Sequence, residues 1–148
     1  MKTIIIYYSL TGKTKKLAES LAKKLKSDIE EITEKKRKRG LFKSGFEAAL
    51  KLKPRILPLK SDLSKYDLVV IGTPIWAGNM SSPVRSFLSK YKDKISKSAF
   101  FCTHGGGGKG KAFKEMRDIC GNPLSVLQAD KNTDERCINE FIDQLKQG

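Results

Sequence analysis

The chain contains few of the residues from which metal sites are built. Its 148 residues include 1 histidine and 3 cysteines, and the cysteines Cys102, Cys120 and Cys137 are widely spaced. Zinc sites use closely spaced pairs of these residue types, so we expect no metal centre. We expect the thiols to be buried structural residues, with a redox role for Cys102 near a strand end as the alternative.

Long apolar runs, repeats and linkers are also missing. No stretch of the sequence approaches the roughly 20 apolar residues that a membrane helix needs, and the N-terminal segment lacks the shape of a secretory signal. We therefore expect a cytoplasmic protein without a membrane span. Because no internal repeat and no Pro-, Gly- or Ser-rich linker interrupts the chain, residues 1–148 are expected to form a single domain.

Acidic residues are scarce beside basic ones. The chain has 30 Lys and Arg against 16 Asp and Glu, for a net charge of +14, and residues 1–60 hold 17 of the basic residues and 6 of the acidic ones. The densest run covers residues 35–39. Such a field attracts acidic proteins, nucleic acid or anionic lipid, and the alternative is a solvated loop without a partner. The run has no interleaved aromatic residues to stack on bases, so we expect no specific nucleic-acid partner.

Apolar runs alternate with amphipathic segments along the chain. The strand candidates are residues 3–8, 28–32, 68–72, 99–103 and 123–128, and three of them are continuously apolar, as in strands buried on both faces of a parallel sheet. Apolar residues recur at helical spacing in residues 17–25, 83–91, 111–120 and 137–145, and a short helix is expected around 42–52. In the helix at 83–91, Ser82 is the expected N-cap and Pro83 the first helical residue. The alternation predicts an α/β fold, a doubly wound parallel sheet of five strands with helices on both faces.

A hydroxyl-rich loop follows the first strand and opens the first helix. It reads Ser9-Leu10-Thr11-Gly12-Lys13-Thr14. The first four N–H groups of a helix lack internal partners and carry partial positive charge, and hydroxyls donate to phosphate oxygens, so the segment is suited to a phosphate. The spacing is neither a Walker loop nor a dinucleotide fingerprint. The alternative is a polar N-cap without a ligand.

Two further loops follow the third and fourth strands. The first contains the only tryptophan and reads Gly72-Thr73-Pro74-Ile75-Trp76-Ala77-Gly78-Asn79-Met80; the second reads Thr103-His104-Gly105-Gly106-Gly107-Gly108-Lys109-Gly110. Ligands of open α/β sheets bind beyond the carboxyl ends of the strands, where these three loops meet. Trp76 is placed to lie on a planar ring, with a Trp packed over the sheet end as the alternative. The glycines allow close backbone approach, with a plain surface loop as the alternative. A flat heteroaromatic ring with a phosphate tail satisfies all three loops, and FMN is such a ligand.

The whole chain resembles the flavodoxin family. Residues 9–14 match the phosphate loop of that family, residues 72–82 resemble the ring-binding loop of flavodoxins and flavodoxin-like quinone reductases, and the His-Gly-Gly part of 103–110 is similar to the third flavin loop. The resemblance implies the strand order 2-1-3-4-5 and FMN as cofactor. The chain departs from the family in its basic charge and in the missing aromatic residue of the third loop, which leaves one flavin face open.

The resemblance also implies which residues touch the cofactor, in three groups. The phosphate is assigned to Ser9, Thr11, Gly12, Lys13 and Thr14; the ring to Thr73, Pro74, Ile75, Trp76, Gly78 and Asn79; and the pyrimidine end to Thr103, His104, Gly105 and Gly106.

Two functions follow from this interpretation. In the first, the chain is an electron carrier in which FMN supplies the redox chemistry, no residue is catalytic, and the partners are acidic redox proteins. In the second, it is an enzyme that reduces quinones or other acceptors with NAD(P)H, and His104 either donates a proton to a quinone oxygen or only contacts the ring edge. A third class, a binder of nucleic acid or anionic membrane that happens to have this fold, rests on the basic run alone.

Overall fold

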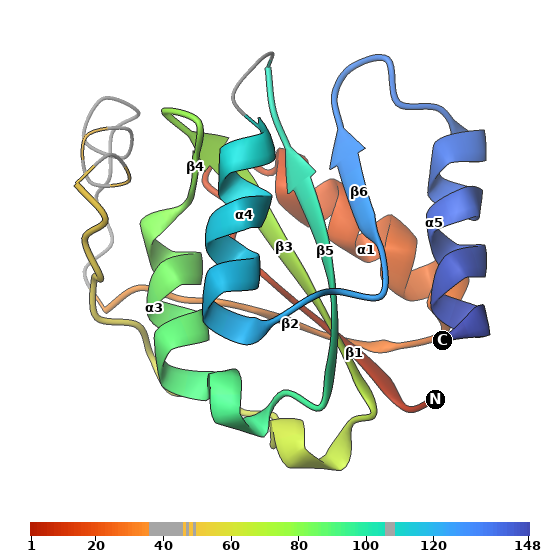
Figure 1. Cartoon of the computed structure of the whole chain (residues 1–148), viewed down its shortest axis with the longest axis horizontal. Helices are drawn as coiled ribbons and strands as arrows, with labels where there is room; N and C mark the ends of the chain where they lie inside the picture. The colour runs from red at the N-terminus through yellow and green to blue at the C-terminus, as the bar shows by residue number, and fades with distance from the viewer. Residues whose placement is uncertain (36–45, 47, 49, 106–108) are drawn as a thin grey trace.

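Three apolar strands form the centre of a parallel sheet in the computed structural model of the chain (Figure 1). β1 (Thr3–Tyr7) pairs with β3 (Leu68–Trp76), and β3 pairs with β5 (Lys97–Thr103). The outer strands β2 (Asp28–Glu31) and β6 (Val126–Ala129) complete the order β2-β1-β3-β5-β6. This is the predicted order of the five parallel strands.

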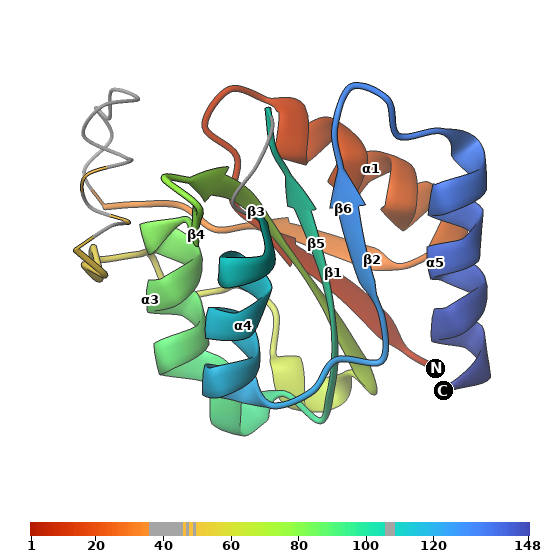
Figure 2. The ribbon, with the colours of Figure 1, turned by 45° about the horizontal axis from the view of Figure 1, so that its top comes forward.

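Two pairs of helices cover the two faces of the sheet (Figures 1 and 2). α1 (Lys13–Leu25) and α5 (Glu135–Gln147) lie on one face, and α3 (Ser82–Tyr91) and α4 (Lys109–Cys120) lie on the other. Two 3-10 turns lie at Leu63–Lys65 and Lys92–Lys94. The structure describes residues 1–35, 46, 48, 50–105 and 109–148. Among these residues no helix combines the length and the apolar character needed to cross a bilayer. The predicted doubly wound α/β fold is confirmed.

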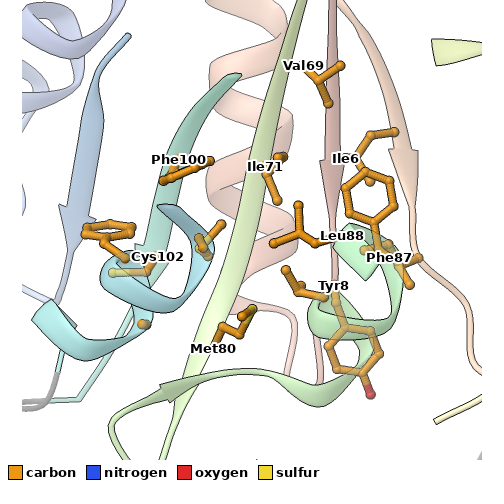
Figure 3. Packing of buried hydrophobic residues seen from close by; sticks show 14 of the residues in the cluster. Ile6, Tyr8, Val69, Ile71, Met80, Phe87, Leu88, Phe100 and Cys102 are labelled. Carbon is orange, nitrogen blue, oxygen red and sulfur yellow. The ribbon is translucent and has the colours of Figure 1, made fainter. Parts of the chain in front are cut away.

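Alternate residues of each central strand enter two separate cores. On the α3 and α4 side, Ile6, Ile71 and Phe100 come from three neighbouring strands and share a cluster with Phe87 and Leu88 of α3 (Figure 3). The residues next to them in the strands point to the α1 and α5 side and pack with apolar residues of those helices. This burial on both faces explains the continuous apolar runs of the sequence.

β3 is longer than predicted and turns into a short sixth strand. It continues past Gly72 to Trp76, and β4 (Asn79–Met80) pairs with its end in an antiparallel hairpin. The sequence Gly-Thr-Pro reads as a turn, so the expected strand ended at Gly72. The strand continues because Thr73 and Pro74 still pair with β5. On the side of β1 the edge of β3 is free beyond Gly72, since β1 ends opposite that residue. A proline is tolerated where a strand has such a free edge.

Several smaller expectations are corrected. The strand expected at 123–128 begins at Val126, and Pro123, which has no N–H to donate, lies before it. The N-cap of α3 is Ser81 and not Ser82, because the helix begins one residue earlier and takes its proline into the first turn. Cys102 is buried as expected, whereas Cys120 is partly exposed and Cys137 is exposed, since it lies at the margin of the apolar stripe of α5. The helix expected around 42–52 falls mainly outside the described residues.

At Gly72 the ring of Phe101, the residue opposite in β5, leaves no room for a side chain. A Cβ built there meets the ring of Phe101 at 2.1 Å, while a Cβ at Gly110 meets nothing within 4 Å. We predict that Gly72→Ala destabilises the fold by about 1–3 kcal/mol, as overpacking of a core does. Thermal unfolding should show a midpoint lower by roughly 4–10 °C. Gly110→Ala is the control and should leave the midpoint unchanged or raise it, because alanine favours a helix. Equal midpoints for Gly72→Ala and the wild type would contradict this packing argument.

Candidate functional site

The parallel register brings three loops to one edge of the sheet. Tyr7 at the end of β1 lies opposite Gly72, and Pro74 of β3 lies opposite Thr103 at the end of β5. The segments that follow β1, β3 and β5 therefore leave from neighbouring positions at the carboxyl edge, where Figure 1 draws the arrowheads of β5 and β6 at the top. The order changes direction between β1 and β3, which is the switch point at which such sheets bind ligands.

The loop after β1 is shaped by one serine and one glycine. Ser9 Oγ accepts hydrogen bonds from the N–H groups of Gly12 at 3.1 Å and Lys15 at 3.2 Å. Gly12 is the N-cap of α1 with φ 93°, a left-handed conformation that favours glycine. Within the described residues the N–H groups of Lys13 and Thr14 have no acceptor. These two donors and the positive end of the helix dipole suit an anion.

A hydrogen bond between two hydroxyls joins the first loop to the third. Thr14 Oγ1 and Thr103 Oγ1 lie 2.7 Å apart, although 89 residues separate them in the chain. Thr14 is only 2% exposed. The contact fixes the start of α1 against the end of β5, so the two loops assigned to the phosphate and to the pyrimidine end have a defined relative position.

The loop after β3 is a tight hairpin. Ile75 pairs with Met80 and Trp76 with Asn79, and the two residues between them, Ala77 and Gly78, have φ values of 49° and 78°. Positive φ at both central residues is typical of the two-residue turn that matches strand twist. The Asn79 side chain stabilises the turn by donating from Nδ2 to the Ala77 carbonyl at 2.9 Å.

Trp76 is packed into the protein and does not form an exposed platform. It is 6% exposed and lies edge-on against Tyr8, with ring centroids 5.5 Å apart and an interplanar angle of 88°. This corresponds to the alternative of a tryptophan packed over the sheet end. The ring of Trp76 supports the hairpin, only its small exposed part is accessible to a ligand, and its assignment to the flavin ring stays a prediction.

The side chain of Thr73 also makes its hydrogen bonds inside the loop. Its Oγ1 donates to the Pro74 carbonyl at 2.9 Å, lies 3.1 Å from Ser81 Oγ and accepts from the Ser81 N–H at 2.9 Å, and the residue is fully buried. Thr73 thus connects β3 to the N-terminus of α3. Pro74 and Ile75 are half-buried, and they and the exposed Ala77 are the side chains of this loop that remain accessible.

The third loop leaves β5 with a half-buried histidine. The backbone N–H of His104 donates to the Ala129 carbonyl at 3.0 Å, which fixes the chain just beyond Thr103. Gly105 is exposed, and a Cβ there would meet nothing within 4 Å. Gly106 lies outside the described residues, so its assignment stays a prediction.

Two of the five buried side-chain polar atoms that lack a hydrogen-bond partner in the described residues lie on the loops at this edge. Within the described residues His104 Nδ1 and Asn79 Oδ1 are buried and make no hydrogen bond. An unsatisfied buried polar atom costs about 1–3 kcal/mol, so a ligand that bonds to it is favoured. Together with the free N–H groups of Lys13 and Thr14, these atoms fit a flat ring with a polar edge and a phosphate, and the assigned residues are compatible with FMN.

Two side-chain pairs that link the elements around these loops carry no signal in the sequence. Tyr8 packs on Trp76 and donates from its hydroxyl to Glu34 Oε2 at 2.8 Å, which connects the end of β1 to the segment after β2. Arg85 and Glu115 form a buried ion pair at 2.7 Å between α3 and α4. These pairs are 26 and 30 residues apart in sequence, and neither follows a helix or strand period. Only the fold brings them together.

The fold and the loops at its carboxyl edge define the flavodoxin-like class of doubly wound α/β proteins. A model of the family described as Flavodoxin matches residues 2–144, and the chain belongs to this family. The resemblance predicted from the sequence is confirmed.

Solved structures and a curated relative agree with this class. The flavoprotein of Lactobacillus acidophilus NCFM, solved in complex with FMN, is similar with a TM-score of 0.80 and 26% identity over 95% of this chain and 98% of that chain. The oxidised flavodoxin 1 of Bacillus cereus shares the fold with a TM-score of 0.60 and 17% identity over 99% and 98% of the two chains. An NAD(P)H dehydrogenase (quinone) of Chromohalobacter salexigens is 30% identical over 95 residues, which are 60% of this chain and 46% of that protein, so the match spans about half of the relative's length.

The hydroxyl contact between Thr14 and Thr103 generates a prediction. Thr14→Val keeps the volume of the side chain and removes both the 2.7 Å contact and the hydroxyl assigned to the phosphate. The loss of one hydrogen bond to the ligand, about 1 kcal/mol, corresponds to a roughly fivefold lower affinity. We expect Thr14→Val and Thr103→Val each to weaken FMN binding by about that factor, measured by quenching of flavin fluorescence.

The control is Thr3→Val, at the opposite end of β1, which should leave FMN affinity unchanged. Unchanged affinity in both Thr14→Val and Thr103→Val, with unfolding midpoints like the wild type, would contradict a role of this contact in the site.

Proposed function

We propose that the chain is an FMN-dependent electron carrier of the flavodoxin type. FMN is its cofactor, and the observation that carries this conclusion is the family match over residues 2–144. The similarity to the FMN-bound flavoprotein of Lactobacillus acidophilus over 95% of this chain supports it. When bound, FMN supplies the redox chemistry, and the chain's own residues bind and orient it.

The residues of the three loops have distinct tasks in this proposal. The first turn of α1 holds the phosphate through backbone N–H groups, with Ser9 fixing the loop rather than pointing to the ligand. Pro74 and Ile75 contact the ring, while Trp76 and Thr73 hold the hairpin from inside. The buried atoms His104 Nδ1 and Asn79 Oδ1 bond to the polar edge of the ring.

The charge of the chain selects its redox partners. With 30 basic and 16 acidic residues, the surface attracts acidic proteins, and such attraction raises association rates at low salt. The same field stabilises negative charge on the reduced flavin. One charge about 10 Å away in water contributes roughly 0.4 kcal/mol, or on the order of 20 mV for one electron.

We predict that the reduction potential of the bound flavin depends on salt. The basic surface makes it less negative than in an acidic flavodoxin, and added salt screens the surface and lowers the potential by tens of mV. Potentiometry of the FMN-loaded protein between about 10 mM and about 1 M salt measures the change, because the Debye length falls from about 30 Å to about 3 Å over this range. A potential that does not change with salt would refute this electrostatic account.

A second function is favoured by one specific observation, the identity of 30% over 95 residues to an NAD(P)H dehydrogenase (quinone). In this alternative the chain takes electrons from NAD(P)H and passes them to a quinone or another acceptor. His104 lies half-buried at the edge of the sheet, where its imidazole would donate a proton to a quinone oxygen.

Mixing the FMN-loaded protein with NADPH under anaerobic conditions separates the two functions. For a carrier we expect the visible flavin absorbance to persist, because no partner protein delivers electrons, whereas a chemical reductant bleaches it. Rapid bleaching by NADPH alone would establish the reductase. In that case His104→Gln should lower turnover with a quinone while leaving the bleaching by NADPH intact, since only the proton donor is removed.

A further inference from the structure

Backbone pairing joins residues 33–35, just after β2, to residues 55–57 of the segment 53–59. Glu34 and Ile56 form an antiparallel bridge, and the N–H of Lys35 donates to the carbonyl of Arg55 at 3.1 Å. This register sets Lys35 directly opposite Arg55. Like charges that face each other across paired strands are destabilising, so this arrangement has a cost that the fold itself does not require.

Two side chains of α3 fix the same segment to the helical layer. Ser86 Oγ donates to the Pro54 carbonyl at 2.6 Å, and the backbone N–H of Leu59 donates to the hydroxyl of Tyr91 at 3.0 Å. Figure 1 shows the gold segment around residues 50–56 running beside α3. The segment supplies Lys53 and Arg55 to one side of a hollow, and α3 supplies Lys90 to the other.

A pocket of about 400 Å³ lies between the segment and the helix. It is lined by Lys35, Lys53, Pro54, Arg55, Ile56, Ser86, Ser89 and Lys90. Four of these side chains are cationic and none is acidic. Within the described parts of the chain, none of the four cations takes part in an ion pair. All four side chains are exposed, so water and salt screen their mutual repulsion, and an anion that enters the pocket reduces it further.

The chemistry of the lining matches a phosphate ester. Arg55 offers a planar fork of donors that suits phosphate oxygens, Lys35, Lys53 and Lys90 offer point charges, and Ser89 offers a hydroxyl. Ile56 and Pro54 add an apolar wall that suits the carbon atoms of a sugar or base. We propose that this pocket binds the phosphomonoester of a small ribonucleotide, either the 2′-phosphate end of NADPH or a 5′-mononucleotide.

The size of the pocket favours a small molecule over a protein surface. Small-molecule sites commonly have volumes of about 300–1,000 Å³, and a pocket of about 400 Å³ admits a nucleotide fragment. An acidic protein would instead need a broad and flat contact area. The pocket is also separate from the flavin loops, because it shares no residue with them. Ser89 lies seven residues beyond the start of α3 at Ser82, which is about 10 Å along the helix.

Calorimetric titration at low salt tests the proposal on protein saturated with FMN, so that the phosphate loop after β1 is filled. The ligands are adenosine 2′,5′-bisphosphate, NADPH, NADH, AMP, inorganic phosphate and a peptide of eight glutamates. We expect at least one phosphomonoester nucleotide to bind. If NADPH binds more strongly than NADH, the pocket recognises the 2′-phosphate end. If AMP binds more strongly than inorganic phosphate, the pocket recognises a 5′-mononucleotide.

The variants Arg55→Gln and Lys90→Gln should each weaken that binding about tenfold, since each loses a charge-assisted hydrogen bond. Lys146→Gln on the far helix α5 makes the same change of charge and should have no effect. Because none of these residues belongs to the flavin loops, FMN affinity stays unchanged in all three variants. Failure of FMN binding would refute the proposed function, and the same titration of FMN-free protein, with Arg55→Gln compared with Lys146→Gln, would still test this pocket.

Three results would overturn the inference. The first is the absence of nucleotide binding, and the second is inorganic phosphate binding as strongly as every nucleotide. The third is binding of the glutamate peptide in place of nucleotides with the same sensitivity to Arg55→Gln, which would assign the pocket to an acidic protein partner. If Lys146→Gln weakened binding as much as Arg55→Gln does, the binding would come from the general charge of the chain and not from the pocket.

Discussion

The parallel pairing of β3 with both β1 and β5 is the constraint on which the rest of the structure depends. It aligns Tyr7 with Gly72 and Pro74 with Thr103, so the chain leaves the sheet three times at the same edge. The same pairing sets Gly72 opposite Phe101 of β5, whose ring occupies the space of a Cβ. Without this register the hydroxyls of Thr14 and Thr103 could not meet, and the loops assigned to the phosphate and the ring would have no fixed position relative to each other.

The fold was predictable because it depends on signals that are local in the sequence. Continuous apolar runs identify strands buried on both faces, and helical periods between them identify the crossovers, which leaves few possible topologies. The end of β3 was not predictable in this way. Gly72, Thr73 and Pro74 have turn propensity, and the strand continues because it pairs with β5 and then with β4. This pairing is a property of the neighbouring strands and not of the segment itself.

The candidate site likewise has features that the local sequence predicts and features that it does not. The backbone features of the loop after β1 follow from Gly12 and the start of a helix, and they are present as expected. The side chains of the second loop are different, because their roles depend on packing partners far away in the sequence. Trp76 lies against Tyr8, and Thr73 bonds to Ser81, so both hold the hairpin from inside. A motif specifies which residue types occur at the loop and leaves open whether each faces the ligand or the core.

The positive charge of the chain acts in two ways that differ in range. At ordinary ionic strength the Debye length is about 10 Å, so the pocket beside α3 acts on the flavin only weakly and on a bound anion strongly. A dianion in the pocket nevertheless cancels about half of the charge of its four cations, and it therefore makes negative charge on the reduced flavin slightly less favourable. Thermodynamic reciprocity then requires that reduction of the flavin weakens the binding of the anion by the same free energy. The basic surface thus couples the occupancy of the pocket to the redox state of the cofactor, and the coupling diminishes as salt screens both.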